Sequence, residues 1–417
     1  MKIGQTAMEI DIYTLKNGIR LIHKKVRNTK VSHCGIFFDV GSRDENELEC
    51  GMAHFWEHMA FKGTRKRKAF HIINRLESLG GEINAYTTKE KICFYASTLD
   101  SHFEKSIELL KDISFHSVFP EKEINKEKSV ILEEMGMYYD SPEDSIHDDF
   151  EELLFRGHPL AHNILGYPDT IKKFRQSDIV NFIGKNLNTH KTVISVVSSI
   201  SSLLVKRYFE KYFNDIPEKL NFPKRPAFLS SEVKIKEEQK NISQTYCVIG
   251  QEALSYSNEE RLPLFLLINI LGGPALNSRL NLSLREKYGL VYNIDAGLNT
   301  YTDTGHLTIS FSTEKSQLDK SKKLIFKELK RLRENKLGIK QLHMAKEQLM
   351  GQIAIAEENN VSFMLMMGRS LIDMDRIEDL NEIFEKIKII DSDTLLEIAN
   401  KYLIEDKFNI LTFLPKN

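Results

Sequence analysis

Hydrophobic and polar residues alternate with a period of two near the start of the chain. The runs YTLK and IRLIHK lie on either side of Asn17-Gly18, and an Asn-Gly pair between alternating runs is typical of a β-hairpin closed by a type I′ turn. Another alternating run predicts a strand over residues 33–40. The pattern therefore predicts that the chain opens on a β-sheet.

A helical period of apolar residues follows this strand. A Gly-Ser pair and several acidic residues lead into a predicted helix at about 47–61. The next predicted helix lies in AFHIINRLESLGG and ends at the Gly-Gly pair. Its apolar residues recur at helical spacing: Phe70, Ile73, Leu76 and Leu79. Strands are then predicted around TTKEK, and helices over residues 100–119 and 121–139.

This mixture of helices and short strands predicts an α+β fold, with helices packed on a mainly antiparallel sheet. A chain of 417 residues exceeds one ordinary core, so we expect two domains. Prolines interrupt both periods amid charged residues: Pro217, Pro223 and Pro226. The expected organisation is a zinc-bearing catalytic domain over 1–215, a linker over 216–232 and a second, similar domain over 233–417.

The two halves of the chain resemble each other. A shift of 215 residues aligns NAYTTKEKICFYASTLDSHFEKSIELL with NTYTDTGHLTISFSTEKSQLDKSKKLI without a gap. The identical pairs include Asn84 and Asn299, Tyr86 and Tyr301, Thr87 and Thr302, Ser97 and Ser312, Lys105 and Lys320, Ser106 and Ser321, and Leu109 and Leu324. An internal duplication is the simplest account, and it predicts two domains of one fold.

Composition narrows the class of protein. Hydrophobic residues make up 41% of the chain and charged residues 28%, which is typical of a soluble globular protein with a full core. The formal net charge of −1 argues against nucleic acid or an anionic membrane as a partner. The one dense basic run, at 65–68, is interpreted as a solvated helix face.

Three features indicate a cytoplasmic protein. No stretch approaches the roughly 18 apolar residues of a membrane span. The N-terminal residues lack the apolar core and the cleavage site of a secretory signal. The cysteines are scattered without a spacing pattern, which suits reduced thiols: Cys34, Cys50, Cys93 and Cys247.

The candidate chemistry begins with His54, Glu57 and His58, which form an H-x-x-E-H motif in CGMAHFWEHMAFKGT. Residues four apart lie on one face of a helix, so the two imidazoles can converge on one ion while Glu57 projects beside it. Two nitrogen ligands and a carboxylate base are the parts of a zinc peptidase site. The alternative is an incidental histidine pair on a surface helix.

A third zinc ligand is predicted on the helix at 121–139. Glu134 shares a helical face with apolar neighbours, whereas Glu133 is turned about 100° away. We interpret that face as an inward stripe, formed with Val130, Ile131, Met137 and Tyr138. A carboxylate directed inward needs a partner, and zinc supplies one.

Other polar residues near the motif leave alternatives open. Glu127 lies two helical turns before Glu134 and is either a carboxylate behind the zinc ligands or an ordinary surface residue. Cys50 lies four residues before His54, but a thiolate there would close the site, so we expect a packed cysteine. Three further histidines are redundant as ligands: His147, His158 and His162.

GMAHFWEHMAFKGT followed by SVILEEM resembles the pitrilysin and insulinase family of inverted zincins, and most of all its short branch, which includes mitochondrial processing peptidase. The resemblance covers essentially the whole chain, including LKNGIRL, GSRDE, LGGEINAYT, HPLAHNILGYPDTI and LGGPALNSRLNLSLREKYGLVY. Trp56 departs from the leucine that is common in the family, and we expect this to change packing alone.

The resemblance assigns roles to individual residues. His54, His58 and Glu134 match the family's zinc ligands, Glu57 matches its catalytic base, and Glu127 matches its accessory glutamate. The resemblance therefore implies an active enzyme with Zn²⁺ as cofactor. Since the second half has no H-x-x-E-H motif, one zinc ion per chain is expected.

The resemblance also implies how substrate is bound. Arg285 and Tyr292 match the family's substrate-clamping pair. Residue type alone would instead predict a surface position for Arg285 and a core position for Tyr292. Donors of this kind bind a peptide carbonyl and the developing oxyanion. Asn84 lies in the segment that matches the family's substrate-binding edge strand. Main-chain hydrogen bonds at a sheet edge depend little on the side chains of the peptide, so broad specificity is implied.

The implied function is a zinc endopeptidase that hydrolyses extended or unfolded peptides. Family enzymes of about twice this length enclose substrate in a chamber of four such domains, so two chains are expected to form one. Because one sequence holds both the zinc motif and the Arg285/Tyr292 pair, we expect a homodimer in which each chain completes the other's site. A heterodimer with an inactive relative is the alternative. The rival function is a non-catalytic peptide-binding or assembly subunit.

Overall fold

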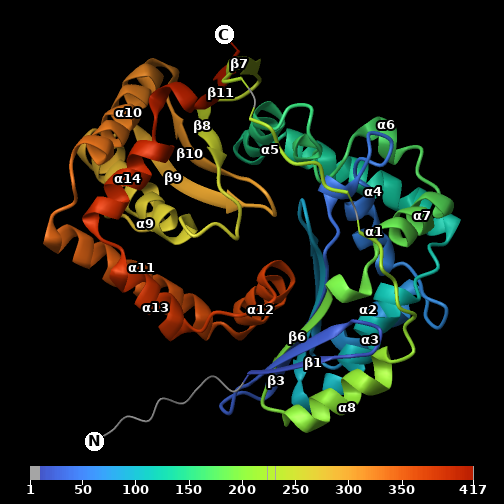
Figure 1. Cartoon of the computed structure of the whole chain (residues 1–417). Coiled ribbons are helices and arrows are strands. Elements are labelled where there is room, and N and C mark those ends of the chain that lie inside the picture. Colours follow the sequence, from blue (N-terminus) through green and yellow to red (C-terminus); the bar gives the residue numbers. More distant parts are fainter. Residues whose placement is uncertain (1–9, 223, 231, 417) are drawn as a thin grey trace, which may run out of the picture. The chain divides into compact units, whose positions relative to one another are not determined.

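The computed structural model describes residues 10–222, 224–230 and 232–416 (Figure 1). These residues form two compact units. Unit 1 contains the described residues up to Met135, together with His162–Arg225 and Ala356–Ile377. Unit 2 contains Gly136–Ala161, Pro226–Ile355 and the described residues from Glu378 onward. None of the described helices is long and apolar enough to cross a membrane.

Unit 1 is built on a six-stranded sheet. In spatial order the strands are β1 (Ile10–Thr14), β2 (Arg20–Lys25), β6 (Thr192–Ser198), β3 (Val31–Phe38), β5 (Ile92–Leu99) and β4 (Glu82–Thr87). Neighbouring strands are antiparallel except β2 and β6. Strand β4 therefore lies at an edge of the sheet, with β5 as its partner.

Helices cover both faces of this sheet. The alternation along β3 directs Ile36 and Phe38 to one core and Phe37 to another. Most helices pack on the first face: α1 (Met52–Ala60), α2 (Ala69–Glu77), α3 (Phe103–Phe115), α4 (Glu121–Tyr139), α7 (Gln176–Asn186) and α8 (Ser202–Phe213). The other face is covered by α12 (Asn360–Met374), which packs on β3 and β6. The short helix α6 spans Pro168–Ile171.

Unit 2 repeats this arrangement on a five-stranded sheet. Its strands, in order, are β7 (Ile235–Lys240), β11 (Asn409–Pro415), β8 (Thr245–Ala253), β10 (Gly305–Thr313) and β9 (Val291–Thr300), with β7 and β11 parallel. Its helices are α5 (Pro142–Leu154), α9 (Arg261–Gly272), α10 (Leu318–Glu334), α11 (Ile339–Glu358), α13 (Leu380–Ile389) and α14 (Ser392–Tyr402). Helices α3 and α10 begin at Phe103 and Leu318, which are 215 residues apart, so the predicted pair of similar α+β domains is confirmed.

The two units exchange a helix, which the expected ranges 1–215 and 233–417 do not anticipate. Helix α5, from the first half of the chain, packs on β8 and β11 of unit 2, and α12, from the second half, belongs to unit 1. Ile146 and Phe150 of α5 are buried against Val248 and Leu411. An apolar helix face shows in the sequence that a helix packs, but it does not show on which sheet.

The first hairpin forms, but its turn is not type I′. A type I′ turn requires a positive φ at both central residues, which would be Asn17 and Gly18. Of these two residues, only Gly18 has a positive φ (87°). Gly18 N–H donates to Leu15 O (3.0 Å) and Leu15 N–H to Ile19 O (2.9 Å), so the loop has three residues. The Asn17 amide instead donates to the main-chain oxygen of Phe213 at the end of α8 (2.9 Å).

Helix α2 lies where it was predicted, but only Leu76 of the predicted apolar stripe is fully buried. Phe70 is 69% exposed and Ile73 is also exposed, whereas Ile72 and Leu76 are buried. The helix therefore packs through a stripe rotated from the predicted one. Its neighbour α1 begins at Met52, later than the predicted start at about 47.

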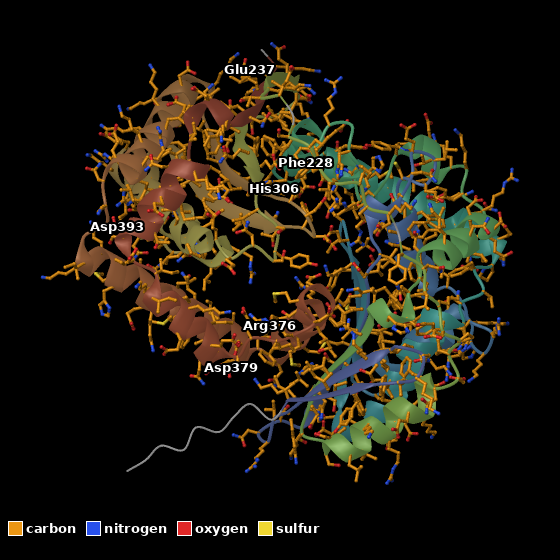
Figure 2. The ribbon with its side chains drawn as sticks, viewed as in Figure 1. Phe228, Glu237, His306, Arg376, Asp379 and Asp393 are labelled. Atoms are coloured by element: carbon orange, nitrogen blue, oxygen red, sulfur yellow. The ribbon has the colours of Figure 1, made fainter. Side chains whose placement is uncertain are left out.

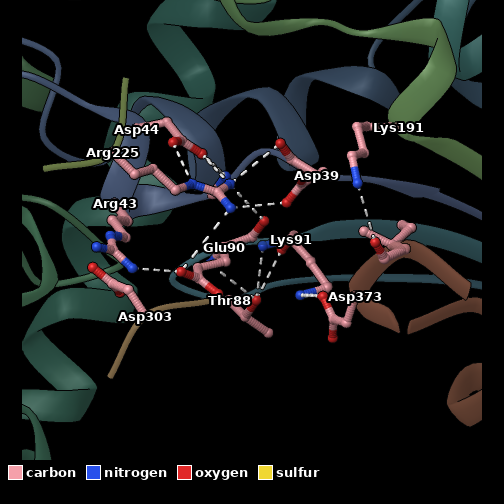
Figure 3. A network of polar contacts seen from close by, with 12 residues as sticks. Asp39, Arg43, Asp44, Thr88, Glu90, Lys91, Lys191, Arg225, Asp303 and Asp373 are labelled. Atoms are coloured by element: carbon pink, nitrogen blue, oxygen red, sulfur yellow. Dashed lines mark hydrogen bonds and ion pairs between the residues drawn. The ribbon is translucent and has the colours of Figure 1, made fainter. Parts of the chain in front are cut away.

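The described residues between α8 and β7 form no helix or strand, and the boundary between the two units falls among them, after Arg225. Within unit 1, the guanidinium of Arg225 donates to both carboxylate oxygens of Asp44 (2.8 Å each) and to Asp39 (2.9 Å), as Figure 3 shows. Within unit 2, Phe228, which is labelled in Figure 2, has a packing partner in the ring of Phe155. The two ring centroids are 5.0 Å apart. Both anchor points are therefore specific side-chain contacts.

Candidate active site

Helix α1 carries the H-x-x-E-H residues, and its first turn is held by a buried carboxylate. Glu45 accepts hydrogen bonds from the main-chain N–H of Gly51 (2.8 Å) and of Ala53 (2.7 Å). These N–H groups have no partner within the helix, and a carboxylate near a helix N-terminus is favoured by the helix dipole. Gly51 has φ 94°, and a Cβ there would lie 2.8 Å from the Leu165 main-chain oxygen. The start of α1 is thereby fixed.

Three predicted ligands meet beside α1. His54 Nε2 and His58 Nε2 lie 3.2 Å apart. The Glu134 carboxylate lies 3.9 Å from His54 Nε2 and 3.5 Å from His58 Nε2. One ligand atom from each residue falls within 4.8 Å of the other two. The structure therefore brings together residues that are up to 80 positions apart in the sequence.

Glu134 reaches this position for a different reason from the predicted one. Val130, Met137 and Tyr138 are exposed, with Met137 at 74%, so they do not form an inward stripe. The buried side of α4 consists of Ile124, Glu127, Ile131 and Met135. Glu134 lies at the border of that side, which lets its side chain extend toward the histidines. Glu134 thus lies beside the histidines as the sequence argument expects, whereas the face assigned to it is wrong.

His58 is held from behind by Glu127. His58 Nδ1 lies 2.9 Å from Glu127 Oε1, and Lys62 Nζ lies 2.7 Å from Glu127 Oε2. Burial acts to raise the pKa of Glu127, but the hydrogen bonds from His58 and Lys62 lower it overall. An ionised Glu127 accepts from an N–H at His58 Nδ1, and in the neutral form of the ring this tautomer has its lone pair on Nε2, which lies nearest His54 Nε2 and Glu134. Since Glu127 is 4% exposed, it is not an ordinary surface residue.

The donor set fits a divalent cation. Burial lowers the pKa of His54 to about 3, so its imidazole is neutral and offers a lone pair. In the tautomers that leave both Nε2 atoms unprotonated, the two lone pairs and the Glu134 carboxylate face one another at 3.2–3.9 Å, an arrangement that a positive charge between them stabilises. Two histidines and one carboxylate are also the ligands of a catalytic zinc site.

Glu57 lies between the two histidines in sequence, and His58 and Glu134 are close enough to act on its pKa. Its Oε2 accepts a hydrogen bond from Thr87 Oγ1 on β4 (2.6 Å). Burial raises the pKa of Glu57, against the opposing effect of the Thr87 hydrogen bond. A carboxylate with a raised pKa is suited to general-base work near neutral pH. Trp56, its neighbour in the chain, is buried against Phe38 with centroids 5.4 Å apart.

A second group of metal-binding side chains lies nearby: Glu45, Cys50 and His162. Both oxygens of Glu45 already accept main-chain hydrogen bonds. Burial and the surrounding carboxylates raise the pKa of the Cys50 thiol to about 12, and the thiol donates to Asn46 O (3.5 Å). A protonated thiol is a poor metal ligand, so this group has a structural role at the start of α1.

The residues matched to substrate binding lie in both units. Asn84 is exposed on edge strand β4 of unit 1. Arg285 lies in the helical turn η5 (Asn281–Lys287) of unit 2, with its guanidinium carbon 6.0 Å from the ring centroid of Tyr292. Tyr292 is 80% exposed, so it is not a core residue.

Sequence reasoning missed three polar residues around the site: Glu45, Lys62 and Thr87. Lys62 contacts Glu127 and Thr87 contacts Glu57, whereas Glu45 accepts from the main chain at the start of α1, and none of the three has a periodic pattern of its own. The available signal was their place in segments that carry the resemblance: Glu45 in GSRDE, Lys62 in GMAHFWEHMAFKGT and Thr87 in LGGEINAYT.

Comparison with known proteins adds to this geometry. Residues 20–168 match the family described as insulinase (peptidase family M16), and residues 173–349 match the peptidase M16 inactive domain. The chain is 31% identical to the uncharacterized zinc protease YmxG of Bacillus subtilis over 396 residues, covering 94% of this chain and 96% of that one. Identity to the beta subunit of the mitochondrial-processing peptidase of Saccharomyces cerevisiae is 28% over 413 residues, covering 94% and 88%.

Solved structures show the same fold. A protease from Helicobacter pylori superposes with a TM-score of 0.91 at 20% identity, covering 98% of this chain and 100% of the other. A peptidase M16 inactive domain from Pseudomonas fluorescens superposes with a TM-score of 0.89, also at 20% identity, covering 98% and 99%.

Proposed function

Because the chain belongs to the insulinase family of peptidases (peptidase family M16), we propose that it is a zinc endopeptidase whose ion is held by His54, His58 and Glu134. The observation that carries the proposal is the convergence of these three ligand atoms within 4.8 Å. The name zinc protease, which several relatives bear, supports zinc as the ion. We expect one ion per chain.

The chemistry assigned to the chain's own residues is proton transfer and orientation. When bound, zinc lowers the pKa of water and polarises a peptide carbonyl. Glu57 takes a proton from water as the water oxygen bonds to the carbonyl carbon, and it delivers that proton to the amine nitrogen when the C–N bond breaks. Glu127 keeps the proton of His58 on Nδ1 throughout, so that Nε2 remains a ligand.

Substrate binding is assigned to Asn84 of one chain and, in a homodimer in which each chain completes the other's site, to Arg285 and Tyr292 of the second copy. An extended peptide adds to the edge of β4 at Asn84 through main-chain hydrogen bonds, which favours unfolded segments over folded ones. Arg285 and Tyr292 donate to the peptide carbonyl and to the oxyanion that forms from it. Such binding has little dependence on side-chain sequence, so broad specificity is expected.

The proposed assembly is a chamber formed by two copies of this chain, in the cytoplasm. A heterodimer with an inactive relative is the alternative, and the word subunit in the name of the yeast relative is a reason to test it. Mass measurement on the purified chain, paired with a cleavage assay on the same sample, separates the two. An active homodimer supports the proposal, and an inactive monomer contradicts it.

The central experiment compares three variants for bound zinc and for cleavage of a quenched peptide. Glu57→Gln keeps the ligands and removes the base, so zinc content is unchanged while turnover falls by roughly 10²- to 10⁴-fold. Glu134→Gln loses zinc and activity together. Glu133→Gln, on the exposed side of the same helix, is the matched control and behaves like the wild type.

Two results would contradict the proposal. Retained turnover in Glu57→Gln would show that Glu57 is not the base. Activity that survives complete removal of zinc by a chelator would show that the reaction does not need the metal. Peptide binding without cleavage by the zinc-loaded wild type would favour the rival function, a non-catalytic peptide-binding or assembly subunit.

A further inference from the structure

Thr87 contacts the base directly from the strand proposed to bind substrate. It is the last residue of β4, and its Oγ1 donates to Glu57 Oε2 at 2.6 Å. Within the described part of the chain, this is the one hydrogen bond that the Glu57 carboxylate receives from protein. The contact joins strand β4 to helix α1, which pack against each other.

The Thr87 hydroxyl is held in place by its strand. Thr87 is paired with Ile92 of β5, at the end of a regular antiparallel ladder. Strand alternation sends the preceding side chain, Tyr86, to the opposite face, where the Arg369 guanidinium lies 5.3 Å from its ring. A β-branched side chain has few rotamers, so the hydroxyl is aimed at Glu57 with little loss of entropy.

The hydrogen bond at Glu57 Oε2 decides which carboxylate oxygen of Glu57 accepts the proton. A glutamate carboxylate rotates easily about its last torsion, and either oxygen can then face the substrate. With Oε2 bound by Thr87, Oε1 is the oxygen left to accept the proton. When Oε1 carries that proton, Oε2 is still an acceptor, so the Thr87 bond persists in both states of Glu57.

We infer that Thr87 is a positioning residue for Glu57, fixing the carboxylate so that Oε1 takes and returns the proton. This inference rests on the proposed function. It also gives β4 a second role: the strand that binds the peptide at Asn84 ends at the residue that orients the base. A peptide aligned along β4 is thus in register with an oriented carboxylate.

The test compares Thr87→Val, which removes the hydroxyl at nearly constant shape, with Thr87→Ser, which keeps it. For Thr87→Val we expect kcat to fall roughly 10- to 100-fold, as for a misplaced catalytic group, with KM within about twofold of the wild type. Zinc content and the thermal midpoint stay unchanged. Thr87→Ser restores most of kcat.

Thr302 provides a matched control, because it is the counterpart of Thr87 in the second half and is exposed. Thr302→Val is expected to have wild-type kinetics. If Thr87→Val does not fold, Thr87→Ala gives the same comparison against Thr87→Ser.

The inference is overturned if Thr87→Val has wild-type kcat, or if its loss of activity follows a loss of zinc. Measuring Glu57→Gln in parallel distinguishes a failure of the Thr87 inference from a failure of the proposed function. An inactive Glu57→Gln beside a fully active Thr87→Val removes only the role of Thr87. An active Glu57→Gln removes the base itself.

Discussion

Replacing Glu127 by glutamine tests whether the buried carboxylate behind His58 sets the affinity for zinc. Glu127 accepts from His58 Nδ1 at 2.9 Å through one oxygen and from Lys62 Nζ at 2.7 Å through the other. A glutamine has one acceptor oxygen and one donor NH₂ group. Whichever way the amide is turned, one of the two donors then faces another donor.

Charge decides which of the two donors, His58 Nδ1 or Lys62 Nζ, loses its acceptor. The Lys62 ammonium is charged and binds the amide oxygen more strongly than a neutral imidazole does. His58 Nδ1 then faces the NH₂ group, and the imidazole gains by moving its proton to Nε2. That tautomer has no lone pair toward Glu134, so a metal ion loses one ligand until the proton moves back.

The expected effect is a 10- to 100-fold loss of zinc affinity, or roughly 1.4–2.7 kcal/mol. Competition with a chromogenic chelator measures the dissociation constant, and Glu133→Gln on the exposed side of α4 is the control. We expect Glu127→Gln to bind zinc weakly and to remain folded without it. Wild-type affinity in Glu127→Gln would refute the reasoning, because it would show that the proton on His58 is set by something other than Glu127.

The remaining predictions concern stability. Arg225→Met leaves the buried Asp44 carboxylate without its partner and should lower the free energy of unfolding by about 3–5 kcal/mol; an unchanged denaturation midpoint would contradict this. Glu45→Ala removes two hydrogen bonds to the first turn of α1, and a loss of about 1–2 kcal/mol in the zinc-free protein is expected, whereas equal stability would show that water caps the helix equally well. Burial lowers the pKa of His23 to about 4, so the unfolded chain binds the extra proton first as pH falls below about 6.5. The wild type should therefore lose about 2 kcal/mol more than His23→Gln between pH 7 and pH 5, as measured by urea denaturation at each pH, and parallel losses in the two proteins would rule this out.

Much of the fold and the centre of the site follow from local patterns. The duplication is visible as a 215-residue offset, and helices α3 and α10 begin at the matching residues Phe103 and Leu318. His54, Glu57 and His58 share a face because a helix repeats every 3.6 residues wherever it lies. Glu134 is identified less directly, since its supporting apolar stripe is wrong, and its resemblance to the family's ligand is the stronger argument.

Other features depend on which surfaces meet. No local pattern pairs Thr87 with Glu57 or Lys62 with Glu127, because each contact joins segments that come together only through packing. The same holds for α5 and α12, whose apolar faces are evident from sequence while the sheets they cover are not. Backbone geometry is local, so sequence by itself determines which side chains share a face of a helix or strand. The partner of that face depends on the fit of buried surfaces, which only the tertiary structure decides.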